Sequence, residues 1–131
     1  MKKAILLMLL VVAFTSFQQP KTLKGTWQFC GGYFNGKPNP APKDYTLQRK
    51  YTTTNYEAFL LEKGEKPYKY EAGNYKLVVD TCLETQTFSA QPSQLKGITV
   101  HFAFTMRHDT LVLKATLPNG FIEEDYWKKV K

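Results

Sequence analysis

Large apolar side chains recur at every second position over most of the chain after residue 23. The spacing is clearest over residues 98–106, where five of them alternate with smaller or polar residues: Ile98, Val100, Phe102, Phe104 and Met106. A period of two places these side chains on one face of a strand. No stretch has a helical apolar face longer than two turns, so the pattern predicts strands throughout.

The pattern predicts eight strands, at residues 25–29, 45–53, 55–61, 70–78, 82–88, 98–106, 111–117 and 121–130. Short turns separate several neighbours, and Asn119-Gly120 is typical of a tight hairpin because both residues tolerate a positive φ. Segments rich in Gly, Pro or polar residues are expected to be loops, at residues 31–43, 63–67 and 90–94. Each strand can therefore pair with the next one in an antiparallel manner.

Eight antiparallel strands without a covering helix would leave sheet edges unpaired, and closure into a barrel removes those edges. We therefore predict an all-β fold, an antiparallel up-and-down β-barrel of about eight to ten strands. A barrel of this size holds a packed interior or one small ligand. A two-sheet sandwich is the alternative, but consecutive hairpins favour the barrel.

The first 18 residues have the features of a secretory signal peptide. Met1-Lys2-Lys3 is basic, residues 4–14 are uninterruptedly apolar, and small polar residues follow at 15 and 16. The apolar run is shorter than the roughly 18 residues of a membrane span, although an uncleaved membrane tether is the alternative. We predict a signal peptide at 1–18 and a barrel domain at 19–131, in a periplasmic or extracellular protein without stable membrane insertion after cleavage.

Composition and charge narrow the choice of partners. The chain has 131 residues, of which 43% are hydrophobic and 15% aromatic, enough for one folded domain. Loss of Lys2 and Lys3 with the signal peptide would lower the net charge from +7 to +5. The remaining lysines are spread along the chain and interleaved with Glu, as in residues 62–66. Because nucleic-acid binding needs a clustered basic surface, no nucleic-acid partner is predicted.

Residues 23–27 read Leu-Lys-Gly-Thr-Trp, and this Gly-x-Trp resembles the opening signature of lipocalins and the wider calycin group. Three further stretches, at 51–56, 73–84 and 117–130, resemble small exported bacterial lipocalin-like domains of uncharacterised function. The resemblance spans nearly the whole chain after the signal peptide. It implies ligand binding in the lumen without naming a ligand. It also implies that Trp27 closes one barrel end and packs against Lys129, or else Lys128, where lipocalins usually have Arg.

Three charged residues fall on strand faces that otherwise carry apolar or aromatic side chains: Arg49, Glu84 and Asp125. Their expected neighbours are Tyr45, Leu47 and Tyr51 for Arg49, Cys82, Gln86 and Phe88 for Glu84, and Phe121 and Trp127 for Asp125. A charge buried in a barrel is costly unless it is paired, so an inward Arg49 should meet Glu84, Asp125 or a ligand anion. A structural ion pair is one interpretation, and a bulge that turns these side chains outward is another.

The functional interpretation is that these charges and nearby aromatic residues orient a small amphipathic ligand. The predicted ligand-binding residues are Tyr45, Arg49, Tyr51, Tyr56, Glu84, Phe102, Phe104, Asp125 and Trp127. Leu113 is expected to line the same cavity. The predicted function is non-catalytic binding of a small hydrophobic or amphipathic ligand in the lumen.

Two other functions remain open at this point. One is a protein–protein interaction or oligomerising module with a filled barrel, using residues 31–43 and 63–68 as contact loops and able to form a homo-oligomer. The other is a hydrolase or isomerase, which would need Glu84 and Asp125 in one open cleft.

Metal or nucleophilic chemistry has little support in the sequence. His101 and His108 have no metal-ligating neighbours at suitable spacing, so no metal and no cofactor are predicted. There is no Gly-x-Ser-x-Gly motif, and a Cys–His pair would have to form by folding alone, so no enzyme is predicted. Cys30 and Cys82 could form a disulfide in an exported chain, but their predicted strands lie on opposite walls, and both states remain open.

Overall fold

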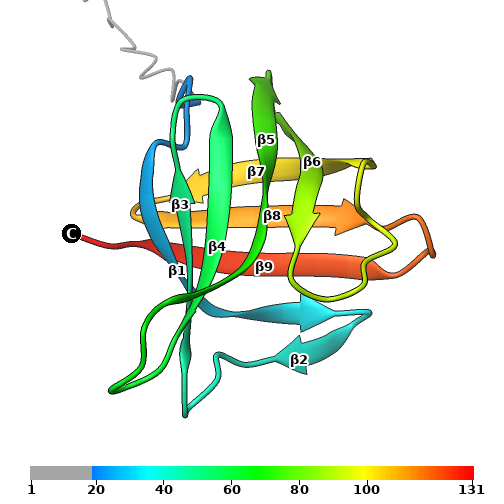
Figure 1. Ribbon diagram of the computed structural model, residues 1–131. Helices are drawn as coiled ribbons and strands as arrows, with labels where there is room; N and C mark the ends of the chain where they lie inside the picture. The colour runs from blue at the N-terminus through cyan, green and yellow to red at the C-terminus, as the bar shows by residue number, and fades with distance from the viewer. Residues whose placement is uncertain (1–18) are drawn as a thin grey trace, which may run out of the picture.

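The computed structural model describes residues 19–131, and the predicted signal peptide at 1–18 lies outside them. Nine strands are present: β1 (Gly25–Phe34), β2 (Lys37–Asn39), β3 (Thr46–Tyr51), β4 (Asn55–Leu61), β5 (Tyr68–Val78), β6 (Thr81–Ser89), β7 (Thr99–Arg107), β8 (Thr110–Thr116) and β9 (Ile122–Lys129). All strands except β2 form an eight-stranded barrel, closed by the pairing of β1 with β9 (Figure 1). The prediction of an all-β, antiparallel up-and-down barrel is confirmed. Within the described residues, no helix is long and apolar enough to cross a membrane.

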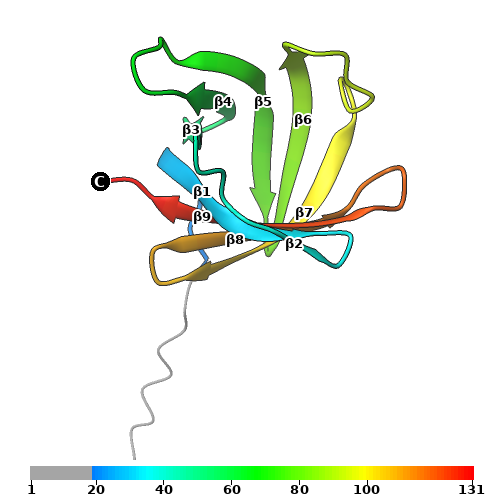
Figure 2. The same cartoon turned by 90° about the horizontal axis from the view of Figure 1, so that it is seen from below.

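The strand connections alternate between the two ends of the barrel. Figures 1 and 2 show β3 to β6 crossing β7 to β9 steeply, with β1 joining the two groups. We call the end with the tight turns at 52–54, 79–80 and 108–109 the turn end. The opposite end, with the longer connections at 40–45, 62–67, 90–98 and 117–121, is the loop end.

The turn end is closed by the segment that precedes β1. Leu23 is fully buried, and its carbonyl oxygen accepts a hydrogen bond of 2.8 Å from Trp27 Nε1. The Leu23 amide donates to the Tyr75 hydroxyl at 3.0 Å. Lys129 Nζ lies 4.5 Å from the centre of the Trp27 ring and donates to the Lys24 carbonyl at 2.8 Å. The residue pair that the lipocalin resemblance implies at this end is thus in contact.

The core follows the alternation of the sequence most closely in β7 and β8. Val100, Phe102 and Phe104 are buried, while the residues between them are exposed. Leu111 and Leu113 are also almost fully buried, and together these side chains fill the barrel beside β6 and β9. Hydrophobic burial of this extent is the main stabilising term for a domain of this size.

The prediction of a continuous loop at residues 31–43 is wrong. β1 continues to Phe34, and β2 pairs with its last three residues. Asn35 and Gly36, both at positive φ, form the turn between the two strands. Gly32 pairs with Asp125 of β9, and a Cβ at Gly32 would collide with the Glu124 carbonyl oxygen. Of the glycines that suggested a loop, Gly32 therefore allows close approach of two strands, and Gly36 allows the turn between β1 and β2.

Three bulges interrupt the alternation, at Cys30 in β1, Tyr70 in β5 and Thr87 in β6. Each inserts one unpaired residue and changes which face the following side chains occupy. Beyond the bulge at Thr87, Phe88 is 40% exposed, although strict alternation places it beside Glu84. Phe121 lies just outside β9 and is also exposed.

Candidate ligand-binding site

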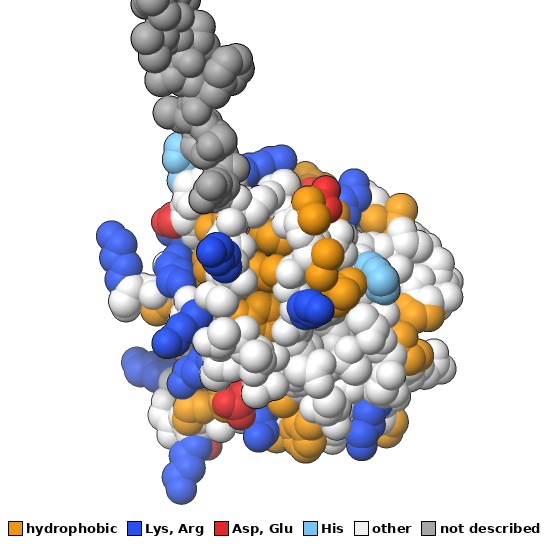
Figure 3. All heavy atoms as spheres, turned by 90° about the horizontal axis from the view of Figure 1, so that it is seen from above, with side chains coloured by type: hydrophobic (Ala, Val, Ile, Leu, Met, Phe, Trp, Pro, Cys, Tyr) orange, Lys and Arg blue, Asp and Glu red, His pale blue; other side chains and the backbone are white. Residues whose placement is uncertain are grey.

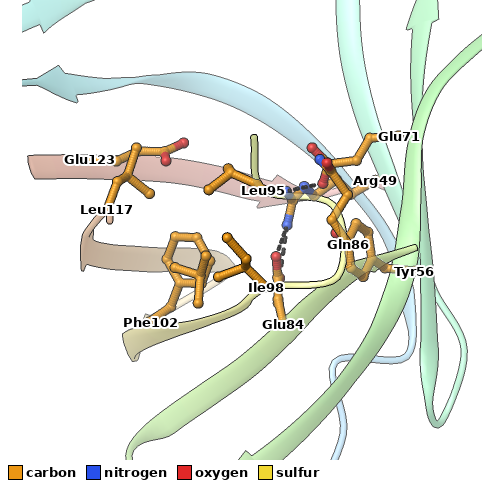
Figure 4. A pocket seen from close by; sticks show the side chains of 11 residues that line it. Arg49, Tyr56, Glu71, Glu84, Gln86, Leu95, Ile98, Phe102, Leu117 and Glu123 are labelled. Atoms are coloured by element: carbon orange, nitrogen blue, oxygen red, sulfur yellow. Dashed lines mark hydrogen bonds and ion pairs between the residues drawn. The ribbon is translucent and has the colours of Figure 1, made fainter. Parts of the chain in front are cut away.

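Two adjoining cavities open toward the loop end and share Arg49, Glu71 and Glu123 in their walls. The larger cavity, of about 250 Å³, is also lined by Asp125 and by four aromatic side chains: Phe29, Tyr45, Tyr70 and Trp127. The smaller, of about 110 Å³, is also lined by Tyr56, Glu84, Gln86, Leu95, Ile98, Val100, Phe102 and Leu117 (Figure 4). We call the residues that line these two cavities the lumen site.

Arg49, from the middle of β3, is the centre of the lumen site. Its Nη1 contacts both carboxylate oxygens of Glu84, at 2.8 and 2.9 Å, and its Nη2 lies 3.2 Å from Glu71 Oε2 (Figure 4). Nη1 also lies 2.9 Å from the Tyr51 hydroxyl, which donates to Glu84 Oε1 at 2.8 Å. Strands β3, β5 and β6 are thereby connected by one charged network inside the barrel.

The network keeps Arg49 charged in spite of its burial. Burial alone would lower the pKa of Arg49, but the charge of Glu84 and its other neighbours raises that pKa overall. The guanidinium carbon lies 4.8 Å from the ring centre of Tyr56 and 5.1 Å from that of Trp127. Arg49 is thus held by two aromatic faces as well as by two carboxylates.

The hydroxyl and thiol groups around Glu84 are protonated donors. Burial raises the pKa of Tyr51 and of Tyr56. Burial, followed by the nearby charge of Glu84, raises the pKa of Cys82, whose Sγ lies 3.9 Å from Glu84 Oε1. A thiol in this state is a poor nucleophile, because the thiolate is the reactive form.

Asp125, from β9, is a buried acid in the wall of the larger cavity. Burial, a hydrogen bond with the Glu123 side chain and the charge of Glu123 together raise the pKa of Asp125 to about 8. Two carboxyl groups can form such a bond only when one of them holds a proton. Asp125 is therefore largely protonated near neutral pH.

The structure brings most of the predicted site residues together. Tyr45, Arg49, Tyr56, Glu84, Phe102, Asp125 and Trp127 line one of the two cavities. Tyr51 takes part in the Arg49 network, and Phe104 and Leu113 belong to the buried core. Arg49 contacts Glu84, one of the three partners expected for it. Glu84 and Asp125 line adjoining cavities rather than the same one.

Sequence reasoning missed two acids of the lumen site. Glu71 has the same parity as the inward Gly73 and Tyr75, and Glu123 has the parity of Asp125, so alternation contained a signal for both. Tyr70 reaches the larger cavity at a bulge, and the smaller cavity takes Leu95, Ile98 and Leu117 from outside the strands. Tyr70 and Leu95 do not follow from periodicity, whereas Ile98 and Leu117 continue the predicted alternation of residues 98–106 and 111–117.

The cysteines and histidines considered in the sequence lie outside the Arg49 ion pairs. Cys30 is exposed, Cys82 is buried, and both are free thiols. His101 and His108 lie on the surface. Within residues 19–131, no group of three or more His, Cys, Asp or Glu side chains is arranged to hold a metal ion.

Comparison with known proteins adds no assignment: no protein-family model matches the chain, and no curated protein matches it in sequence. The class of the protein therefore follows only from its fold and its site. The protein is an antiparallel eight-stranded up-and-down β-barrel, compatible with a lipocalin-like fold, with a charged cluster inside its loop end.

Proposed function

We propose that this chain is an exported, non-catalytic β-barrel protein that binds a small amphipathic ligand in its lumen. The observation that carries the proposal is the pair of adjoining cavities at the loop end, which combine charged and aromatic walls. Ligand sites of barrels commonly lie at the mouth and contain a few oriented polar groups within an aromatic surround. The signal-peptide pattern of residues 1–18 supports export to the periplasm or beyond.

The charged lining favours an amphipathic ligand over a purely hydrophobic one. An apolar ligand placed against Arg49, Glu71 and Glu123 would remove water from these groups without replacing their hydrogen bonds, which is unfavourable. A ligand with one polar end can satisfy them and still contact the aromatic wall. Because Cys82 is protonated and the Glu84 carboxylate is engaged by Arg49 and Tyr51, catalysis by these groups is not favoured.

Native mass spectrometry tests this proposal on protein purified from cells that express the full chain. A bound small molecule should appear as added mass in the native spectrum and disappear on denaturation. The variant Tyr45→Ala, which removes one aromatic wall of the larger cavity, should lose most of this mass. Tyr68→Ala, which truncates an exposed tyrosine outside the lumen site, should retain it. The proposal would be contradicted if the purified protein carried no bound molecule and also failed to bind phenylethylamine, phenylethanolamine, phenylethanol and phenylpropionate.

A surface interaction role is a second candidate, favoured by an exposed apolar cluster at the loop end. Phe34 and Phe121 pack edge to face with ring centres 5.5 Å apart, and both are about 40% exposed. Tyr33 and Ile122 are exposed next to them. Size-exclusion chromatography with light scattering checks this candidate, which requires a dimer or larger species that Phe34→Ser converts to monomer.

A further inference from the structure

Negative charge is gathered inside the barrel, although the protein as a whole is basic. The two cavities are lined by the carboxyl groups of Glu71, Glu84, Glu123 and the largely protonated Asp125, and by one cation, Arg49. The chain has a net charge of +7. On the face seen in Figure 3, Lys and Arg side chains are spread more widely than Asp and Glu side chains. The interior of the lumen site thus differs in sign from the surface.

Arg49 offsets only part of this negative charge. Its two Nη atoms are occupied by Glu84 and Glu71. Neither Glu123 nor Asp125 forms an ion pair with any Lys, Arg or His among residues 19–131. In a partly buried site, where the effective dielectric constant is low, two neighbouring carboxylates would repel each other strongly, and the proton that Asp125 holds beside Glu123 relieves this repulsion. An ammonium group of a ligand can take the place of this proton.

Unpaired buried donors are a second, independent feature of the larger cavity. Trp127 is only 4% exposed and lines this cavity, yet its Nε1 has no hydrogen-bond acceptor in the described part of the chain. The same holds for Arg49 Nε. Buried donors are nearly always paired in folded proteins, so these two indicate an acceptor that a ligand supplies.

The remaining wall of the larger cavity limits the size and shape of the ligand. Phe29, Tyr45 and Tyr70 lie there with Trp127, and such aromatic faces attract cations as well as apolar groups. The cavity volume of about 250 Å³ lies below the roughly 300 Å³ at which pockets for drug-sized ligands begin. A molecule with a single ring or a short apolar body fits this space better than a long acyl chain.

We propose that the lumen site binds a small amine, with its ammonium group among Glu71, Glu123 and Asp125 and a ligand oxygen accepting from Trp127 Nε1. Amino alcohols and phenolic amines with one apolar group have this chemistry. The inference rests on the proposed function, because it specifies the ligand class of the same site. Burial and the Glu123 contact raise the pKa of Asp125 to about 8, so Asp125 is protonated in most molecules at neutral pH. Binding of an amine should release this proton from a fraction of the molecules.

Isothermal titration calorimetry with four probes of one shape tests the charge preference. The probes are phenylethylamine, phenylethanolamine, phenylethanol and phenylpropionate, which present an ammonium, an ammonium with a hydroxyl, a neutral hydroxyl and a carboxylate. The titrations use protein purified from cells that express the full chain, at about pH 7. Both amines should bind at least about tenfold tighter than phenylethanol, and phenylpropionate should bind weakest. Phenylethanolamine should be the tightest of the four.

Matched variants on β9 locate the binding charge. Glu123→Gln and Asp125→Asn should each weaken amine binding by about tenfold. Glu124→Gln makes the same chemical change on the next residue, whose side chain bonds to Tyr126 outside the lumen site, and should leave the affinity unchanged. Circular dichroism of each variant shows that the barrel is retained.

The outcomes separate this inference from the proposed function. Tight binding of phenylethanol or phenylpropionate relative to the amines would overturn the inference and leave lumenal binding intact. Equal effects of Glu123→Gln and Glu124→Gln would also overturn it, because the charge would then act only at long range. Equal affinity of the two amines would overturn the part of the inference in which a ligand oxygen accepts a hydrogen bond from Trp127 Nε1. Failure of all four probes, with no co-purified mass, would overturn both the inference and the proposed function.

Discussion

Removal of the Arg49 side-chain charge should be strongly destabilising. Arg49→Met leaves Glu84, whose side chain is only 4% exposed, without its cationic partner, and it leaves Glu71 unpaired as well. Breaking a buried ion pair by removing one partner costs about 3–5 kcal/mol, because the remaining charge is uncompensated. The aromatic contacts of Arg49 with Tyr56 and Trp127 are lost too. We expect a loss of about 4 kcal/mol in the free energy of unfolding.

Urea unfolding at neutral pH measures this change. For a urea dependence of about 2 kcal/mol per molar, the midpoint of Arg49→Met should fall by about 2 M at an unchanged slope. Lys69→Met is the matched control, because it removes a cation from a surface ion pair in which both partners are more than 40% exposed. Such a pair contributes at most about 1 kcal/mol, so the control should move the midpoint little.

A double-mutant cycle isolates the pair itself. Glu84→Gln alone keeps a hydrogen-bond acceptor and leaves Arg49 paired with Glu71, so it should cost less than Arg49→Met. In the double variant no unpaired charge remains at position 84, and the combined loss should be smaller than the sum of the single losses by about 2 kcal/mol. Additive losses, or a loss for Arg49→Met no larger than that for Lys69→Met, would refute the reasoning.

Three further predictions follow from individual side chains. Because the pKa of Asp125 is raised from 3.8 to about 8, its stabilising contribution is fully present below pH 3.8 and is lost as pH rises through 8. Relative to Asp125→Asn, the wild-type free energy of unfolding should fall by roughly 5 kcal/mol over this window, and equal pH profiles in urea titrations would contradict it. Lys129→Ala should cost about 1 kcal/mol, while Lys129→Arg should retain stability by stacking on Trp27, as paired thermal scans can show. Maleimide should label Cys30 but not Cys82 in the native protein, and failure of both to react in the unreduced, denatured chain would reveal a disulfide between them.

The strand pattern could be predicted from the sequence because burial and periodicity agree over long stretches. In β7, Val100, Phe102 and Phe104 are buried and alternate with exposed residues, and β4 begins and ends at the predicted residues. Asn119-Gly120 also lies in the connection between β8 and β9, as its turn chemistry indicates. In each of these places, local conformational preference and the closed barrel favour the same arrangement.

The second half of β1 could not be predicted in this way. Its side chains carry a weak apolar signal, and its glycines are explained only by a neighbouring strand that lies far away in the sequence. Asn35-Gly36 was a usable hairpin signal, but the prolines around it favoured a loop. Prediction fails here because backbone pairing, rather than side-chain burial, determines the structure.

The site could be predicted only in part, because alternation identifies inward residues only where no bulge interrupts the strand. Parity places Arg49 and Glu84 inside the barrel, and the cost of a buried charge requires a partner for each. The bulges cannot be found from parity, since a single inserted residue changes the face of every side chain that follows. Tyr70, at one of these bulges, therefore entered the cavity wall without a sequence signal.

The Arg49 network bears on both interpretations of the buried charges. A buried ion pair is weak support for stability, because well-packed apolar residues of similar volume often stabilise a protein as much or more. A purely structural role would therefore explain Arg49 and Glu84 poorly, and it would not explain Glu123 and Asp125, which form no ion pair with the described cations. Groups that are costly to the free protein and line a cavity are accounted for if a ligand compensates them. On this argument, an ammonium ligand that binds the folded site should stabilise the barrel, and the free energy of unfolding should increase with the ligand concentration relative to its Kd.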